Sequence, residues 1–489
     1  MPLRILVILL IIGALIAAFF PALVTLLILG VLIAVVLLAR NLEFGLILLI
    51  FFYPYLGLVI DFSTVESLRE IPYLGSINAP FIDLYGLVFF AAWGLRILTS
   101  PKYEIRMTNQ SQMTKTQNSS LVIRVSSLLP HWKSYFLFWL SGLLSLWRVP
   151  SINFATSLKY FLRPFTFFYL VFFAPVVSIL TGIRNYESGI RMLHRVLTVF
   201  YWTGLISAID GLLGLFFGAH EAFPRATPFG LFGVNPLGPN HNLLAETLIA
   251  TAPAGLILMN QESTALAGQA GIRNQGRQWI KYGMWFQWGI ALLTFARTAW
   301  IAIAVQAGLY LWFGLETKKR GEMIKRVKKV MPIMLLIAVF FAMLIATTFT
   351  ETVRGSTLSR FDQARIVAFY FDRTPILGQG IGTFIPTLWH TRAYLLEYGD
   401  PLEAHGILFK LMFEQGALGL ITFMAFLGSI LWVIWQAYRK APGNATLVAL
   451  FIASGAITYQ LFNTTYYTSK LWVPLAVAIA LAISKLRTK

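Results

Sequence analysis

Long apolar runs, separated by short polar stretches, follow one another along almost the whole chain. A hydrocarbon core about 30 Å thick needs roughly 20 apolar residues in each helix that crosses it. Runs of this kind predict about fourteen helical spans, centred near residues 12, 31, 51, 89, 141, 171, 207, 249, 289, 307, 340, 427, 455 and 478. The pattern therefore predicts an all-α polytopic membrane protein with about 12–14 transmembrane helices.

The polar stretches differ in charge, and this difference predicts the sidedness of the chain. If the amino terminus is cytoplasmic, the cytoplasmic segments are 99–133, 182–193, 259–281, 316–329 and 438–445. These segments hold the clusters of Lys and Arg that cytoplasmic loops retain. Residues 350–404 instead balance arginines against acidic residues. They are therefore predicted to form one large periplasmic or extracellular loop.

Composition supports the bilayer as the solvent of this protein. Of its 489 residues, 57% are hydrophobic and 12% are charged, which is outside the range of soluble globular proteins. A net charge of +19 could indicate a nucleic-acid partner, but the basic residues lie in short loops, where they would meet anionic lipid headgroups. The absence of Cys excludes disulfides and thiolate nucleophiles. Membrane lipids are thus expected partners, and nucleic acid is not.

Two charged residues fall inside predicted spans, where charge is costly. Arg163 lies in the sixth span, shortly after Lys159, and Asp210 lies in the seventh. They could form a buried structural ion pair or extend towards the membrane surface. Alternatively, they could contact a lipid-linked anion, so both interpretations stay open.

Polar residues also gather at the predicted outer ends of spans. Arg225 is followed by the turn sequence PLGPNHN (residues 236–242), which contains Asn240. A Gly, Pro and Asn-rich turn beside an arginine can direct backbone N–H groups and a guanidinium at an oxyanion. Arg297 interrupts two apolar runs within LTFARTAW (residues 293–300), which predicts a turn at the outer face. Arg297 could bind an anion there or merely anchor the helix at the interface.

A third group of candidate residues lies between Arg360 and His405. In PILGQGIGTF (residues 375–384), Gly380 and Gly382 permit a tight turn and close approach of the backbone to a ligand. Such a glycine pattern alone is a weak sign of phosphate binding. His405 precedes a predicted helix that enters the membrane, where a lone histidine is more often structural than catalytic.

Taken together, these segments resemble the O-antigen ligase, O-antigen polymerase and bacterial O-oligosaccharyltransferase family. Four segments occur in the order typical of that family: the Asn-rich turn, the turn at Arg297, PILGQGIGTF with its upstream arginine, and AHGILFKLMFEQGALG. The resemblance covers roughly residues 220–440. Two positions depart from the pattern: Ala296-Arg297-Thr298 replaces Ser-Arg-Gly, and Gly406 follows the histidine where Asn is usual.

The resemblance implies a GT-C-like glycosyltransferase of the bacterial cytoplasmic membrane. It would move a glycan from undecaprenyl pyrophosphate to a hydroxyl group of lipid A core, another glycan or a protein, with its active site facing the periplasm or exterior. Arginine forks suit phosphate oxygens, and histidine can remove a hydroxyl proton near neutral pH. The expected catalytic residues are therefore His405, Arg297 and Arg225, and the expected substrate-binding residues are Arg360, Arg163, Asn240, Gly380 and Gly382.

The same resemblance divides the chain into three parts. These are N-terminal transmembrane helices (1–218), an O-antigen ligase-like catalytic region (219–440) and C-terminal transmembrane helices (441–489). Three alternatives remain. They are a polymerase of the same family, a solute or anion transporter that uses Arg163 and Asp210, and a non-catalytic scaffold for cell-wall assembly, in which His405 would be replaceable. The polar residues gather at the predicted outer face and not at the midplane, which favours a transferase.

No cofactor and no metal are expected at the outer site, because it offers mostly cations. Mg²⁺ or Mn²⁺ on a pyrophosphate normally requires one or two carboxylates. Asp61, with Glu66 and Glu70, lies in an early outer loop and is the acidic group that could supply them. Glu66 and Glu70 are one helical turn apart, which favours a solvated helix over a metal site.

Overall fold

The structure is a computed structural model of the 489-residue chain. It describes residues 22–61, 78–99, 132–182, 186–218, 224–230, 234–238, 240–265, 270–314, 321, 322, 325, 329, 332, 336, 343, 350–398, 406–463 and 468–486. The predicted span centres near residues 12 and 340 and the candidate base His405 lie outside the described residues.

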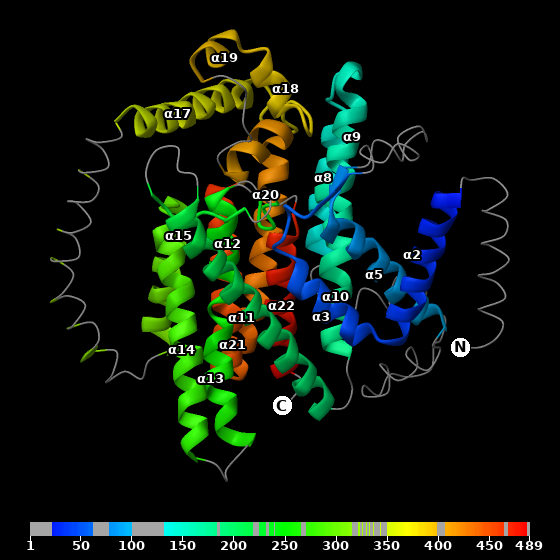
Figure 1. The fold of residues 1–489 in the computed structure, drawn as a ribbon. Coiled ribbons are helices and arrows are strands. Elements are labelled where there is room, and N and C mark those ends of the chain that lie inside the picture. Colours follow the sequence, from blue (N-terminus) through cyan, green and yellow to red (C-terminus); the bar gives the residue numbers. More distant parts are fainter. Residues whose placement is uncertain are drawn as a thin grey trace.

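The described part of the chain is a bundle of helices (Figure 1), and its one sheet is a small antiparallel pair, β1 (Val59–Asp61) and β2 (Asn78–Pro80). Within that part, six helical stretches are long and apolar enough to cross a membrane: Phe81–Thr99, Ser151–Thr181, Arg191–Phe217, His241–Met259, Ile407–Lys440 and Asn444–Phe462. The fold class predicted from the sequence, an all-α polytopic membrane protein, is confirmed.

Two predicted spans, centred near residues 31 and 51, form one sharply bent pair. Here α2 (Ala22–Arg40) and α3 (Leu42–Phe52) meet at Asn41, and the pair is bent by 111° over Leu26–Phe52. The Asn41 side chain accepts a hydrogen bond from the Phe44 amide (3.1 Å) and so caps α3. If the pair is one broken span, the described residues hold up to seven spans.

The centre of the bundle is formed by α20 (Ile407–Lys440), α21 (Asn444–Phe462) and α22 (Ser469–Leu486). From Leu471 to Ala482, α22 is buried at nearly every position, so it is the central helix. Stacked aromatic rings fill the contact with its neighbours. The Tyr135 and Tyr169 rings lie 3.5 Å apart, and Trp472 packs on both.

The remaining helices surround this centre. They are α5 (Phe81–Thr99), α8 (Trp132–Leu146), η2 (Ser151–Asn153), α9 (Phe154–Leu162), η3 (Arg163–Phe173), α10 (Ala174–Gly182), α11 (Tyr186–Phe217), α12 (His241–Thr251), α13 (Ala254–Ala265), α14 (Ala270–Leu293), α15 (Arg297–Leu309) and η4 (Tyr310–Gly314). η3 is a π-helical segment that begins at Arg163-Pro164. Because Pro164 has no backbone N–H, the regular α-helical bonding is interrupted there.

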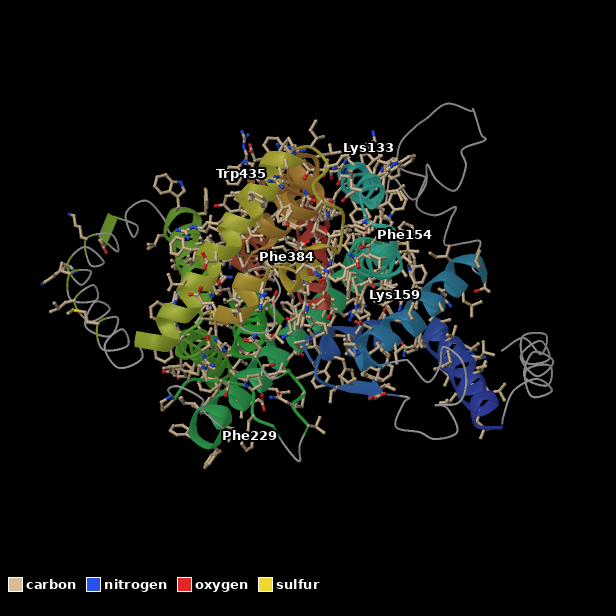
Figure 2. The ribbon with its side chains drawn as sticks, turned by 90° about the horizontal axis from the view of Figure 1, so that it is seen from above. Lys133, Phe154, Lys159, Phe229, Phe384 and Trp435 are labelled. Carbon is tan, nitrogen blue, oxygen red and sulfur yellow. The ribbon has the colours of Figure 1, made fainter. Side chains whose placement is uncertain are left out.

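The long polar segment near residue 350 is helical and covers one end of the bundle (Figure 1). It contains α17 (Thr350–Arg373), α18 (Phe384–Trp389) and α19 (Arg392–Tyr398), whereas the last turns of α13 and of α22 lie at the opposite end. A small core of its own joins this cap to α20, made of Val367, Phe384, Leu388, Tyr394 and Phe413. Figure 2 looks onto this end and shows Phe384 near its middle.

Candidate functional site

The segment that carries Arg225, residues 224–230, lies directly on α11. A Cβ atom added to Gly214 would be 1.8 Å from the carbonyl oxygen of Thr227, so only glycine permits this approach. The Phe229 amide donates a hydrogen bond to the Asp210 carboxylate (3.2 Å). Asp210, which the sequence left between a structural and a functional interpretation, therefore holds the segment that presents Arg225.

The same segment is joined to the end of α14. The Ala226 amide donates to the Leu293 carbonyl oxygen (2.8 Å), and Arg297 begins α15 four residues later. Between the two helices, Phe295 has φ +55°, an uncommon left-handed conformation for a large side chain. The turn expected at Arg297 is thus present, and it follows the residue to which the Arg225 segment is bonded.

Arg360 lies half-buried on α17 and interacts electrostatically with Arg297. Burial and the neighbouring Arg297 guanidinium lower the pKa of Arg360 below its usual value. The Arg360 Nε atom is buried and makes no hydrogen bond to any residue that the structure describes. Like charges that act on each other are unfavourable unless an anion lies between them. The guanidinium groups of Arg297 on α15 and Arg360 on α17 thus interact electrostatically.

A histidine that sequence reasoning did not assign joins this cluster. His241 is the first residue of α12 and interacts electrostatically with Arg225. Asn240 precedes it, and its side-chain oxygen accepts a hydrogen bond from the Asn242 amide (2.8 Å), which caps the helix. Asn240 was expected to bind substrate. Its side-chain oxygen instead has a structural role as the cap of α12. The sequence signal that could have identified His241 is its place in the Asn-rich turn that follows Arg225.

The glycine-rich segment is fastened to a break in α20. Gly416 has φ +64° and ψ −159°, so the helix is interrupted there. On one side of the break, the Gln379 and Gly380 amides donate to the carbonyl oxygens of Phe413 (2.8 Å) and Glu414 (3.0 Å). On the other side, the Ala417 amide donates to the Pro375 carbonyl oxygen (2.7 Å). The loop therefore replaces the helical hydrogen bonds that the break removes.

This geometry does not support the prediction that Gly380 and Gly382 bind substrate. The Gly380 N–H is used within the protein, and a Cβ atom on Gly380 would be 2.6 Å from the Val149 side chain. Gly382 packs against α9, since a Cβ atom there would be 3.2 Å from the Ser157 Cα atom. Both glycines are buried, and they allow the loop to pass between α20 and the α8–α9 connection.

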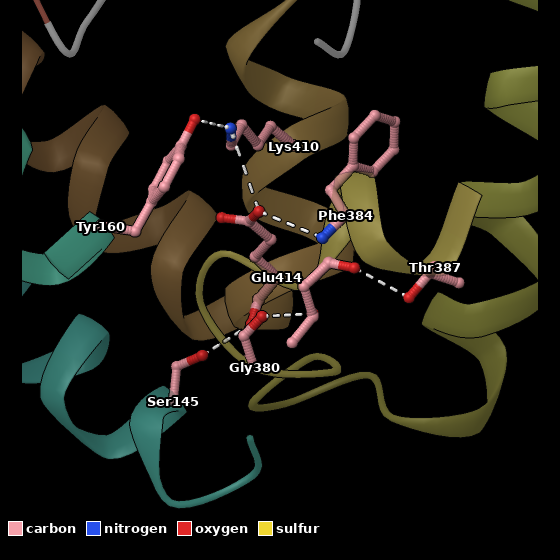
Figure 3. Close-up of polar contacts among 8 residues, drawn as sticks. Ser145, Tyr160, Gly380, Phe384, Thr387, Lys410 and Glu414 are labelled. Carbon is pink, nitrogen blue, oxygen red and sulfur yellow. Dashed lines mark hydrogen bonds and ion pairs between the residues drawn. The ribbon is translucent and has the colours of Figure 1, made fainter. Parts of the chain in front are cut away.

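Glu414 joins four elements at this position (Figure 3). Its carbonyl oxygen also accepts from the Ser145 hydroxyl of α8 (2.6 Å), and its carboxylate accepts from the Phe384 amide at the start of α18 (3.3 Å). The Lys410 ammonium lies 4.0 Å from that carboxylate and donates to the Tyr160 hydroxyl of α9 (2.6 Å). This buried pair therefore fixes the cap on the bundle.

Arg163 is not brought to the arginine cluster. Its guanidinium forms an ion pair with Asp83 of α5 at 2.6 Å, in which Asp83 is buried and Arg163 is half-exposed. α9, which ends next to Arg163, stands on the opposite side of α20 from α15 (Figure 1). The structural interpretation of Arg163, an ion pair at a membrane helix, thus has a partner in the structure.

The remaining predicted residue, His405, lies outside the described residues, but Gly406 is described. Gly406 has φ +113°, and a Cβ atom there would be 2.7 Å from the Leu461 carbonyl oxygen at the end of α21. Among the described residues, no group of three His, Asp or Glu side chains could hold a metal ion. The expectation of a metal-free site stays a prediction.

Comparison with known proteins matches one part of the chain to a family. The family described as O-Antigen ligase matches residues 282–424. This range contains Arg297, Arg360, the glycine-rich segment and the α20 break, and it lies within the 220–440 region of the sequence resemblance. A search of curated proteins finds no match.

Proposed function

From the match of residues 282–424 to the family described as O-Antigen ligase, we propose that this chain is a membrane glycosyltransferase of the ligase or polymerase type. It transfers a glycan from undecaprenyl pyrophosphate to a hydroxyl acceptor. The donor, the acceptor, a location in the bacterial cytoplasmic membrane and an active site facing the periplasm are parts of the proposal. The cap of α17–α19 is then the outer end of the molecule.

One observation carries the proposal: three arginines from separate elements are linked, Arg297 to Arg360 by their charges and Arg225 to the Arg297 turn by a backbone hydrogen bond. Burial and the Arg297 guanidinium lower the pKa of Arg360, and the Arg225 segment is bonded to the residue that ends α14. Fixed guanidinium groups in a site sheltered from water stabilise a diphosphate most when its negative charge grows. This growth occurs as the diphosphate leaves the sugar.

The proposed reaction is a substitution at the anomeric carbon of the donor. The acceptor oxygen forms a bond to that carbon, and the bond from the carbon to the diphosphate oxygen breaks. The diphosphate leaves with the electron pair, and Arg225, Arg297 and Arg360 stabilise its charge. His405 takes the proton of the acceptor hydroxyl. His405 thus receives the hydroxyl proton, and the three arginines bind the leaving diphosphate.

Ligation and polymerisation differ in the acceptor and not in this chemistry. We favour ligation of a finished chain, with polymerisation as the alternative. The lipid-linked glycans of a deletion strain distinguish them: full-length chains on the lipid carrier support a ligase, and single repeat units support a polymerase. Unchanged glycans would contradict both and favour a transporter.

The direct test uses purified protein in liposomes with an undecaprenyl pyrophosphate-linked glycan and a hydroxyl acceptor. We expect glycan transfer together with release of undecaprenyl pyrophosphate. Transport of the donor without release of the carrier would contradict the proposal. Orientation is tested by reporter fusions: a fusion at residue 380 should report a periplasmic position, and one at residue 325 a cytoplasmic position.

A further inference from the structure

Two charged side chains are buried next to the first turn of α12, and the proposed reaction does not use them. Lys470 of α22 is 1% exposed and Glu246 of α12 is 2% exposed. The Glu246 carboxylate attracts the Lys470 ammonium. It also accepts a hydrogen bond from the Gln460 amide of α21 (2.6 Å). Three helices of the bundle therefore meet at one buried polar cluster.

Side chains at this cluster form hydrogen bonds with the first turn of α12. The Lys470 ammonium donates to the Leu243 carbonyl oxygen (2.7 Å), and the Tyr459 hydroxyl donates to the Asn242 carbonyl oxygen (2.6 Å). Both carbonyl groups belong to the first turn of α12. The Asn240 side chain caps the same turn from the other end. Side chains from α21 and α22 thus fix this turn to the centre of the bundle.

Two buried charges are a costly way to hold two membrane helices together. Apolar residues of similar size would often be as stabilising or more so, because they avoid the desolvation of both charges. Charged residues inside membrane proteins therefore mark functional positions more often than structural ones. Unlike apolar contacts, hydrogen bonds are directional, so each one fixes the position of one carbonyl oxygen.

The turn that is fixed in this way carries His241. Arg225, one of the proposed diphosphate ligands, interacts electrostatically with His241. The segment that carries Arg225 is held by Asp210 and Leu293, so the segments of both interacting residues are anchored to the bundle. An imidazole N–H at this position is suited to donate to a phosphate oxygen that a guanidinium already binds.

We propose that His241 is a further ligand of the donor diphosphate and that Lys470, through the first turn of α12, is the positioning residue for it. This inference rests on the proposed function, because it takes the arginine cluster as the diphosphate site. Lys470 itself contacts the Leu243 carbonyl and acts only by way of α12. Tyr459 acts in the same way through Asn242.

The test is a double-mutant cycle on binding of undecaprenyl pyrophosphate to the purified full-length protein. A hydrogen bond to a charged group contributes about 1.5–3 kcal/mol, so His241→Ala should weaken binding about 10- to 100-fold. Lys470→Gln should cause a similar loss. The double variant should be no weaker than the stronger single variant, because both changes remove the same contact.

Gln306→Leu is the matched control. Gln306 of α15 is also buried and donates to an α12 carbonyl oxygen, that of Ile249 (3.0 Å), about two turns beyond the first turn. Its loss should lower thermal stability and leave the effect of His241→Ala unchanged. Tyr459→Phe removes one hydroxyl group and serves if Lys470→Gln does not fold; it should show partial coupling to His241→Ala.

Three outcomes separate this inference from the proposed function. Suppose that wild-type protein binds undecaprenyl pyrophosphate, but that the losses of binding free energy caused by Lys470→Gln and His241→Ala are fully additive. Lys470 is then only structural, and the inference is wrong. Unchanged binding in His241→Ala would also overturn it. If the wild type shows neither binding nor transfer, the proposed function itself is wrong.

Discussion

The Ala226 amide donates a hydrogen bond to the Leu293 carbonyl oxygen (2.8 Å), which joins the segment after α11 to the last residue of α14. Arg225 precedes the first of these residues, and Arg297 follows the second by four positions. One backbone contact between segments nearly 70 residues apart therefore aligns two of the proposed diphosphate ligands. Its integrity can be tested without changing either arginine.

Gly214→Ala should separate these ligands. The new methyl group would lie 1.8 Å from the Thr227 carbonyl oxygen, so residues 224–230 must move away from α11. We expect transfer to fall at least about tenfold while the protein still inserts, because misplacing a charge by about 1 Å is costly in a preorganised site. Gly289→Ala on α14 is the control, since nothing lies within 4 Å of its new methyl group. Equal activity of both variants would contradict the assignment of Arg225.

Arg297→Lys should lose most activity while the protein remains inserted and abundant. Charge is kept, but an ammonium group cannot reproduce the bidentate fork of a guanidinium on a diphosphate. Arg365→Lys on α17 is the control, because Arg365 is exposed and bonds Asp362 at 3.3 Å. Initial rates of glycan transfer are the measurement. Wild-type rates in Arg297→Lys would show that this residue only anchors α15 at the interface.

Glu414→Gln should destabilise the protein more than Glu414→Gln combined with Lys410→Met. The single change leaves the Lys410 ammonium buried beside a neutral amide, and breaking a buried ion pair costs about 3–5 kcal/mol. The double change removes both charges. Thermal unfolding in detergent compares them. A lower unfolding temperature for the double variant than for Glu414→Gln would indicate that the Glu414 charge does not stabilise the buried Lys410 ammonium.

His405→Ala should abolish transfer and leave donor binding largely intact, because the proposed base acts on the acceptor and the arginines hold the donor. A general base contributes about 10²–10⁴-fold to the rate. Donor affinity and transfer rate are measured on the same preparation. A parallel loss of donor affinity would place His405 in the diphosphate site and remove the acid–base argument.

Transfer should persist in excess chelator. Three guanidinium groups repel a divalent cation and supply the positive charge that a metal would otherwise bring to the diphosphate. The measurement is transfer by purified protein with EDTA, before and after addition of Mn²⁺. Activity that is lost with EDTA, returns with Mn²⁺ and depends on Asp61 would overturn the metal-free mechanism.

Apolar run length and residue order by themselves determine much about this protein. Helical spans were predictable because a run of about 20 apolar residues has few other stable states in a bilayer. The turns at Arg225 and Arg297 were predictable because each interrupts such runs. The matched family range, 282–424, lies inside the region marked by those motifs.

Tertiary structure decided which polar residues act together. Arg297 and Arg360 interact electrostatically because α17 folds back over the bundle, whereas Arg163 is paired with Asp83 on another helix. Gly380 bonds Glu414, since the break at Gly416 leaves a carbonyl group that needs a partner. The turn that carries His241 gained its neighbours from α21 and α22, more than 200 residues away. Such contacts depend on how distant helices pack, and local sequence patterns carry no information about that packing.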